Sequence, residues 1–198
     1  MINFDVKTIM TEDPKKIEKV YQQMKSLTET DILVGIPEEK APRIEGKGKN
    51  KKSVQGMNNA TLLYIHTNGS DLHNLPPRPV IEPALEASGN KERIEDDLKK
   101  ITELILSGQL NDAKKMMTIT GTDAVNMIKS WFDDPRNNWP PDAPGTVKAK
   151  LRKKTKSKKK RKELYEEYEA GASDINRVLI DTGQMRNAIT YVIRDNKS

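Results

Sequence analysis

One stretch of the sequence decides the fold: Arg177-Val178-Leu179-Ile180-Asp181-Thr182-Gly183-Gln184-Met185-Arg186-Asn187-Ala188-Ile189-Thr190-Tyr191-Val192-Ile193. It contains an apolar run, a turn signal at 181–183 and then an alternating segment. Ile189, Tyr191 and Ile193 point to one side, and Thr190, Val192 and Arg194 point to the other. This alternation predicts a half-buried strand at Ala188–Arg194, with the Arg177–Ile180 segment as a second strand of the same sheet.

The closing strand needs an earlier partner, and the chain offers one at Asp31–Ile36, a short apolar run that ends at a proline. Pro14–Leu27 has apolar residues at helical spacing, which predicts a helix that packs its stripe on the core. Asn90–Trp131 predicts an antiparallel helical hairpin broken at Ser107-Gly108, with Gly121 as a weak point in its second helix. We therefore predict an α+β fold in which a small antiparallel sheet packs against these helices.

The composition indicates a lean core and a large solvated surface. The chain has 198 residues, of which 34% are hydrophobic and 32% charged. This length predicts a single domain spanning 1–198. Residues 38–56 contain almost nothing apolar, so we expect a flexible polar loop that orders only on a partner.

Several classes of function are disfavoured by what the sequence lacks. With no cysteine, the chain has no disulfide, no thiolate zinc site and no cysteine nucleophile. Met1–Met10 has no apolar run flanked by a basic segment, so we expect no signal peptide, and no apolar stretch is long enough to span a membrane. His66 and His73 are the only histidines, without a nearby carboxylate cluster. We therefore expect no enzyme activity, no metal and no cofactor.

A charged insertion at 148–171 is the strongest polyelectrolyte feature of a chain whose net charge is +6. Eleven basic residues at Lys148–Lys162 precede a block of glutamates, and we expect both blocks on one helix. The basic run predicts contact either with nucleic acid, without sequence preference, or with an acidic protein. It has no interleaved aromatic residue, so base stacking is not indicated. The candidate contact residues are Lys153, Lys154, Lys156, Lys158, Lys159, Lys160 and Arg161.

Four stretches, taken in order, resemble the virion-morphogenesis or tail-completion family of tailed bacteriophages. The family pattern is matched within Asp31–Arg194 by Leu63-Tyr64-Ile65-His66-Thr67-Asn68-Gly69-Ser70, by Leu75-Pro76-Pro77-Arg78-Pro79-Val80-Ile81-Glu82-Pro83-Ala84-Leu85, by Trp139-Pro140-Pro141-Asp142-Ala143-Pro144-Gly145-Thr146-Val147-Lys148-Ala149-Lys150, and by Leu179-Ile180-Asp181-Thr182-Gly183-Gln184-Met185-Arg186-Asn187-Ala188-Ile189. Val80 departs from the family, which usually has Phe there. Each stretch is common by itself, but their order and spacing are specific.

The resemblance implies a structural protein of the virion neck, assembled in the host cytoplasm, that forms a ring of six copies between the DNA-filled head and the tail. Its partners would be connector or stopper proteins, tail terminator or tail tube proteins, and genomic DNA in the lumen. Two alternatives stay open: a tail-terminator ring that caps the tail tube, and a non-specific nucleic-acid-binding protein acting through Lys148–Lys162. The structural residues we single out are Arg78 and Pro79 at an elbow, Trp139 and Pro140 in a proline-rich loop, and Asp181, Thr182 and Gly183 at the turn before the closing strand.

Overall fold

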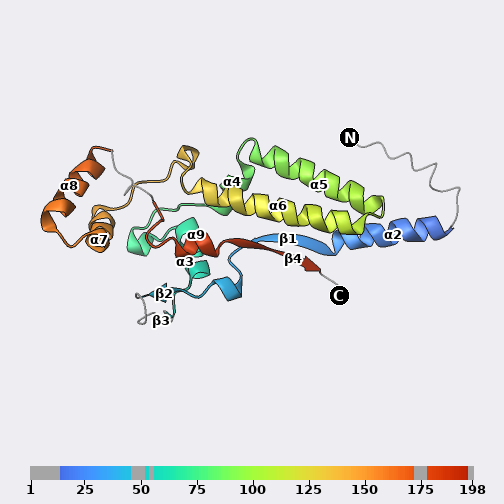
Figure 1. Cartoon of the computed structure of the whole chain (residues 1–198), viewed down its shortest axis with the longest axis horizontal. Coiled ribbons are helices and arrows are strands. Elements are labelled where there is room, and N and C mark those ends of the chain that lie inside the picture. Colours follow the sequence, from blue (N-terminus) through green and yellow to red (C-terminus); the bar gives the residue numbers. More distant parts are fainter. Residues whose placement is uncertain (1–13, 46–51, 54–55, 172–177, 196–198) are drawn as a thin grey trace. The chain divides into compact units, whose positions relative to one another are not determined.

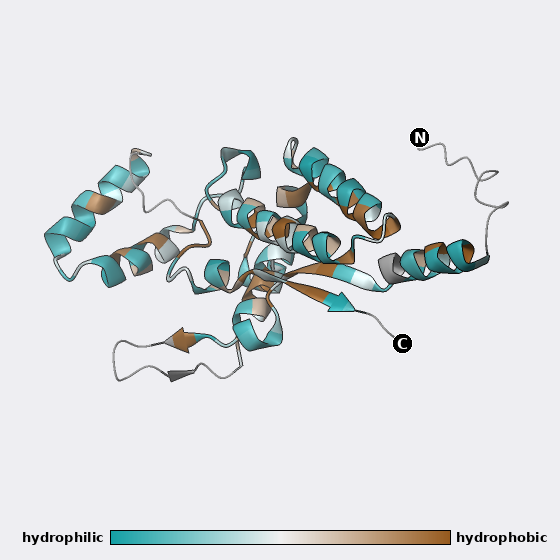
Figure 2. Cartoon of the chain, turned by 45° about the vertical axis from the view of Figure 1, so that its right-hand side comes forward, coloured by the Kyte–Doolittle hydropathy of each residue, from teal (hydrophilic) through white to brown (hydrophobic). Residues whose placement is uncertain are grey.

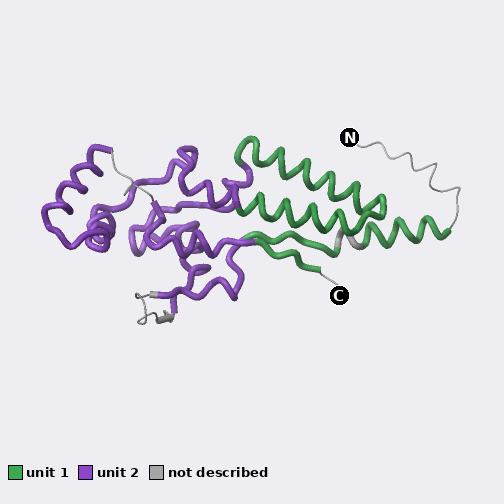
Figure 3. The backbone as a smooth tube through the Cα atoms, viewed as in Figure 1, with its two compact units in different colours: residues 1–34, 87–125, 191–198 green, residues 35–86, 126–190 purple. Residues whose placement is uncertain are grey.

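The computed structural model describes residues 14–45, 52–53, 56–171 and 178–195 (Figure 1). The chain divides into two compact units (Figure 3). As far as they are described, the first unit consists of residues up to 34 together with 87–125 and those from 191 onward. The second consists of 35–86 and 126–190. Each unit therefore joins segments that lie far apart in the sequence.

The first unit combines helices with a two-stranded ribbon. Its elements are α2 (Pro14–Thr28), β1 (Thr30–Gly35), α5 (Asn90–Leu106), the first part of α6 (Leu110–Trp131) and β4 (Thr190–Asp195). Among the described strands, β1 and β4 pair only with each other. They are antiparallel, because the hydroxyl of Thr30 at the start of β1 donates to the carboxylate of Asp195 at the end of β4, at 3.2 Å. The predicted α+β class, with a small antiparallel sheet against helices, is confirmed.

The core of this unit lies between the α5–α6 hairpin and the ribbon. Ile101 and Ile105 of α5 pack against Ala113 and Met117 of α6, and all four are buried. Partly buried side chains from both strands and both helices complete the cluster: Ile32, Ile193, Leu104 and Met116. The predicted hairpin is confirmed. So are the two faces of the closing strand, because Ile193 faces this core whereas Val192 and Arg194 are exposed.

Gly121 has a different structural role from the weak point in the helix that its sequence context predicts. The helix α6 continues through it without a break. A side chain at Gly121 would overlap the ring of Tyr191 on β4. The glycine is therefore a point where the strand approaches the helix closely, rather than a weak point of the helix.

The helix α2 forms as predicted, but the expectation that its apolar stripe packs on the core is wrong. Ile17, Tyr21 and Met24 are 47%, 60% and 55% exposed. Among the described side chains of α2, the buried one is the polar Gln23, whose amide nitrogen would lie 3.2 Å from a Cβ at Gly108 in the α5–α6 turn. The periodicity identified the helix correctly but predicted the wrong face as the covered one.

The second unit consists mostly of short elements joined by proline-containing loops. They are η1 (Glu38–Lys40), β2 (Ile44–Glu45), β3 (Lys52–Ser53), α3 (Asn59–Asn68), η3 (Asp71–His73), α4 (Ile81–Glu86), η4 (Pro135–Asn137), α7 (Pro144–Lys154), α8 (Lys158–Glu169) and α9 (Gln184–Ala188). The strands β2 and β3 form an antiparallel pair in which Ile44 lies opposite Ser53. Among the described residues, no helix is both long and apolar enough to cross a membrane.

The predicted strand at Arg177–Ile180 is not formed in its described part. Residues 178–180 make a turn, and Leu179 has a φ of 63°, a left-handed backbone that cannot continue a strand. Arg177 lies outside the described residues. The closing strand also begins later than predicted, at Thr190, because Ala188 ends the short helix α9.

The stretch 38–56 is more ordered in its described part than its polarity predicts. Ala41 is buried, and its carbonyl accepts a hydrogen bond from the backbone N–H of Asn59 at 2.8 Å. The Asn59 side-chain amide also donates to the Pro42 carbonyl, at 3.3 Å. The start of α3 thus holds the first part of this stretch in place, while residues 46–51 and 54–55 lie outside the described part.

Candidate functional site: the junction of the sequence motifs

The four stretches that carry the family resemblance meet around one hollow of the second unit. This hollow has a volume of about 220 Å³. Each stretch contributes to its lining, with His66 from the first, Arg78 from the second, Asp142 from the third and 181–183 from the fourth. We call this region the motif junction. Its residues are spread over more than a hundred positions of sequence, so only the fold brings them together.

Arg78 lies at the centre of the junction and is 4% exposed. Its guanidinium donates to the Pro140 carbonyl from Nε, at 3.2 Å, and from Nη2, at 3.0 Å. Nη2 also donates to the Pro141 carbonyl at 3.0 Å. The Arg78 backbone N–H donates to the His66 carbonyl at 2.6 Å. One residue therefore ties the end of α3 and the proline-rich loop to the elbow on which it lies.

The loop is held a second time by Trp139. Its indole N–H donates to the Pro79 carbonyl at 3.1 Å, and its ring meets the buried Phe132 ring edge-on with centroids 5.8 Å apart. The elbow residues Arg78 and Pro79 and the loop residues Trp139 and Pro140 thus form one hydrogen-bonded connection. Trp139 therefore fixes the proline-rich loop to the elbow through its indole N–H and its ring.

Arg78, Asp142 and Lys150 form a triad of charged side chains. The Asp142 carboxylate lies 3.8 Å from Arg78 Nη2 and accepts from Lys150 Nζ at 2.6 Å. Burial lowers the pKa of the neighbouring His66, and the positive charge of Arg78 lowers that pKa further, against a smaller opposing effect of Asp142. The imidazole is therefore neutral near pH 7. Among the described residues, no group of three or more histidines and carboxylates is placed to hold a metal ion.

The turn at 181–183 leads into α9 rather than directly into the last strand. The Gln184 side chain accepts from the Ile44 N–H at 2.9 Å and donates to the Ile44 carbonyl at 2.7 Å, which attaches α9 to β2. Arg186 donates to the Lys129 carbonyl at 2.8 Å, which attaches it to the end of α6. The helix α9, which precedes the closing strand, is thus attached to both β2 and the end of α6.

Replacing Gly183 by Val should lower the free energy of unfolding by about 1–2 kcal/mol. Gly183 has a φ of +74°, and a Cβ there would meet only the Asn187 amide at an ordinary 3.6 Å. The cost is therefore conformational rather than steric, so Gly183→Asn should recover most of the stability because Asn tolerates this backbone region. Urea unfolding of the wild type, Gly183→Val and Gly183→Asn measures these free energies. A Val variant as stable as the wild type would contradict the positive φ assigned to Gly183.

The candidate basic contacts fall on two helices, not on the single helix predicted. The helix α7 ends at Lys154, and Thr155 is extended with φ −147° and ψ 143°. Ser157 then caps α8 by accepting a hydrogen bond from the backbone N–H of Lys160 at 3.4 Å. Lys153 pairs with Asp181 of the motif junction. The other candidates make no hydrogen bond or ion pair to the described residues of the junction.

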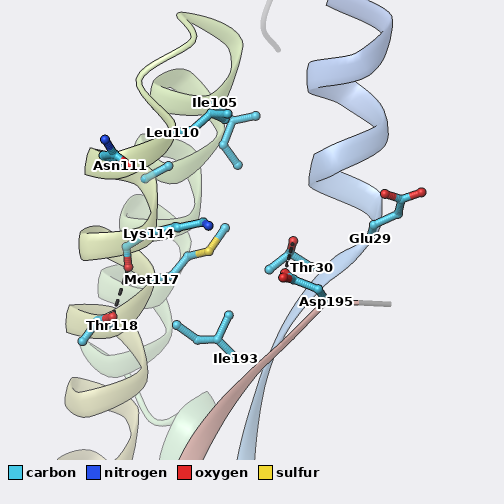
Figure 4. Close-up of a pocket in the computed structure, with 11 residues that line it drawn as sticks. Glu29, Thr30, Ile105, Leu110, Asn111, Lys114, Met117, Thr118, Ile193 and Asp195 are labelled. Atoms are coloured by element: carbon cyan, nitrogen blue, oxygen red, sulfur yellow. Dashed lines mark hydrogen bonds between the residues drawn. The ribbon is translucent and has the colours of Figure 1, made fainter. Parts of the chain in front are cut away.

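A larger hollow of about 570 Å³ lies in the first unit, where the ribbon meets the α5–α6 turn (Figure 4). Its floor is apolar, with Ile105, Met117 and Ile193. Figure 4 shows Lys114, Glu29 and Asp195 around it. The lining thus combines an apolar floor with the charged side chains of Glu29, Lys114 and Asp195.

Sequence reasoning missed three residues that build the motif junction. Asp142 and Lys150 form a partly buried ion pair there, and Gln184 makes two hydrogen bonds with β2. A carboxylate directly after two prolines was the available signal for Asp142, since a rigid loop fixes the side chain that follows it. Nothing in the local sequence indicates the partners of Lys150 or Gln184.

Comparisons with protein-family models, with curated proteins and with solved structures found no match to this chain.

Proposed function

We propose that this protein is a structural component of a phage virion neck, which forms a homo-oligomeric ring, with six copies expected, between the DNA-filled head and the tail. Its role is to join protein assemblies, without catalysis. The observation that carries the proposal is the motif junction, where the four stretches of the family resemblance share one structural task. Arg78 and Trp139 hold the first three stretches together, and the fourth lines the same hollow through 181–183.

The exposed apolar surface of the first unit supports assembly with other chains. Ile17, Tyr21 and Met24 form an uncovered stripe on α2. On the outer face of the ribbon, Leu33 and Val192 are 42% and 40% exposed, and Figure 2 shows a brown segment in each of β1 and β4. Apolar surface of this kind is covered by partner molecules in assembled proteins. We infer that neighbouring copies of the ring cover the α2 stripe.

The ribbon supports the same proposal through its backbone. In the part of the chain that the structure describes, β1 and β4 have no third strand beside them. An isolated two-stranded ribbon is marginal in water and leaves two rows of unpaired peptide groups. A segment of an adjoining protein that adds to either edge would satisfy these groups.

Deletion of the gene from the encoding phage tests the proposal. Electron microscopy of the lysate should show separate DNA-filled heads and finished tails, and the wild-type gene supplied in trans should restore joined virions. A gene carrying Tyr21→Glu should fail to restore them, because a carboxylate would replace the most exposed apolar residue of the α2 stripe. A gene carrying Lys16→Glu, also exposed on α2 but outside the stripe, is the matched control. Joined virions in the deletion lysate would overturn the proposed function.

A further inference from the structure

The charged insertion folds as a helical hairpin with a small core of its own. Val147 and Leu151 of α7 are 0% and 1% exposed, and Leu164, Tyr165 and Tyr168 of α8 pack against them. Lys148 Nζ lies 5.2 Å from the centroid of the Tyr165 ring, and the Tyr168 hydroxyl donates to the Asp142 carbonyl at 3.3 Å. The hairpin therefore presents its charges on a folded element attached to the motif junction.

The cations gather where α7 ends and α8 begins. We call residues 152–162 the basic tip, which holds nine basic side chains in eleven residues: Arg152, Lys153, Lys154, Lys156, Lys158, Lys159, Lys160, Arg161 and Lys162. Within the described chain, six of the nine side chains form neither an ion pair nor a hydrogen bond: Arg152, Lys154, Lys156, Lys158, Lys159 and Lys160. All six are exposed. The tip thus carries a dense positive charge that the rest of the described protein leaves uncompensated.

The charge order along α8 opposes the helix dipole. Its first turn contains Lys158, Lys159 and Lys160 and no acidic residue, and its last turns contain Glu166, Glu167 and Glu169. Cations at the positive end and carboxylates at the negative end both disfavour the helix. An anionic ligand at the basic tip would relieve the first of these repulsions, while the glutamates would keep it from the other end of α8.

The basic tip lacks the exposed apolar side chains that a specific protein interface requires. Specific protein interfaces have a buried apolar centre with aromatic anchors. Residues 144–171 expose no large apolar side chain, because Val147, Leu151, Leu164, Tyr165 and Tyr168 all face the hairpin core at least in part. Figure 2 shows α8 largely teal. A phosphate backbone, in contrast, is bound by cations alone.

We propose that the basic tip of the α7–α8 hairpin binds the phosphate backbone of double-stranded DNA without sequence preference. Lysines predominate over arginines there, which suits point-charge contact with phosphates that differ in position from one site to the next. The proposal holds for the single chain and does not depend on the neck role.

Binding of a short fluorescein-labelled DNA duplex to the full-length protein, followed by anisotropy, tests the proposal. The dissociation constant should rise steeply between about 50 and 200 mM salt, with a log–log slope of about 4–5 in magnitude, and should be the same for two unrelated sequences. The triple variant Lys158→Gln, Lys159→Gln, Lys160→Gln should bind at least about tenfold more weakly at low salt and lower the slope by about 2–3.

The matched control is Lys91→Gln, Lys99→Gln, Lys100→Gln, which removes the same charge from exposed positions of α5. It should bind the duplex like the wild type. Equal weakening by both triple variants would overturn the proposal, because binding would then follow net charge instead of the tip. Tighter binding of poly-glutamate than of the duplex at equal salt would also overturn it, in favour of an acidic protein. Since this assay uses purified protein and DNA, its failure leaves the outcome of the gene deletion unaffected.

Discussion

Replacing Arg78 by Met is expected to lower the free energy of unfolding by about 3–4 kcal/mol. The methionine keeps most of the side-chain volume, so the loss arises from polar groups rather than from a cavity. The carbonyls of Pro140 and Pro141 lose their donors, and Asp142 keeps only Lys150 as a partner. Because a small domain is stable by only about 5–15 kcal/mol, this one side chain supports much of the unit.

Tryptophan fluorescence during urea unfolding is a direct measurement of this loss. The chain has two tryptophans, and Trp131 and Trp139 both belong to the second unit, so the signal follows that unit alone. The native emission of Arg78→Met should also shift to longer wavelength, because loosening of the loop exposes Trp139, which is held by the Pro79 carbonyl.

The control for charge is Arg152→Met in the same unit. Arg152 is exposed and forms no ion pair with a described residue, so its replacement should change the free energy of unfolding by less than about 0.5 kcal/mol. Arg78→Lys should fall between the two, since an ammonium cannot donate to both carbonyls with the geometry of the guanidinium. A free energy of unfolding for Arg78→Met within about 1 kcal/mol of the wild-type value would be no larger a change than a surface substitution causes. The motif junction would then not stabilise the unit as we describe.

Local sequence patterns correctly predicted the helices and strands in which apolar residues recur at regular spacing. The helices α2, α5 and α6 follow from apolar spacing, and β4 follows from alternation. Where one residue reverses the backbone, the pattern fails: Val178-Leu179-Ile180 has strand-forming composition, yet the left-handed Leu179 makes it a turn. Alternation describes which side chains are apolar, and it is silent about a single unusual φ.

Packing partners were the second limit of sequence reasoning. The stripe of α2 has the spacing of a core helix, but the residue that meets the α5–α6 turn is Gln23. The same holds for the motif junction, where Arg78 and Trp139 were identified but the roles of Asp142 and Lys150 were not. Their pairing depends on how the proline-rich loop runs past the elbow, which is a property of the three-dimensional arrangement.

Replacing Gly69 by Ala should have an even larger effect, a loss of about 3–5 kcal/mol from the free energy of unfolding. Gly69 ends α3 with φ 73° and ψ −174°, a combination that side-chain-bearing residues adopt only at a high cost. A Cβ there would also lie 2.7 Å from the Leu75 carbonyl oxygen and 2.8 Å from the Pro77 nitrogen. Both obstacles are backbone atoms, which cannot rotate away as a side chain does.

The substitution at Gly69 should also affect Arg78, because Pro77, whose nitrogen obstructs the added Cβ, directly precedes Arg78 in the chain. Ser70 and Leu75 bridge each other through two backbone hydrogen bonds, of 2.8 and 2.9 Å, and hold the loop against Gly69. Moving the loop to admit a methyl group would displace Arg78 from the carbonyls that it binds. The Gly69→Ala protein should therefore show the same shift of Trp139 emission as Arg78→Met, and the two substitutions should be less than additive when combined.

The matched control is Gly145→Ala, at the start of α7. A Cβ at Gly145 meets nothing within 4 Å, and alanine favours the helix, so this variant should be as stable as the wild type or slightly more stable. Urea unfolding followed by tryptophan fluorescence compares the two glycines under one signal. Full additivity of Gly69→Ala and Arg78→Met would show that the end of α3 and the proline-rich loop are stabilised independently, and the motif junction would then not be a single cooperative structure.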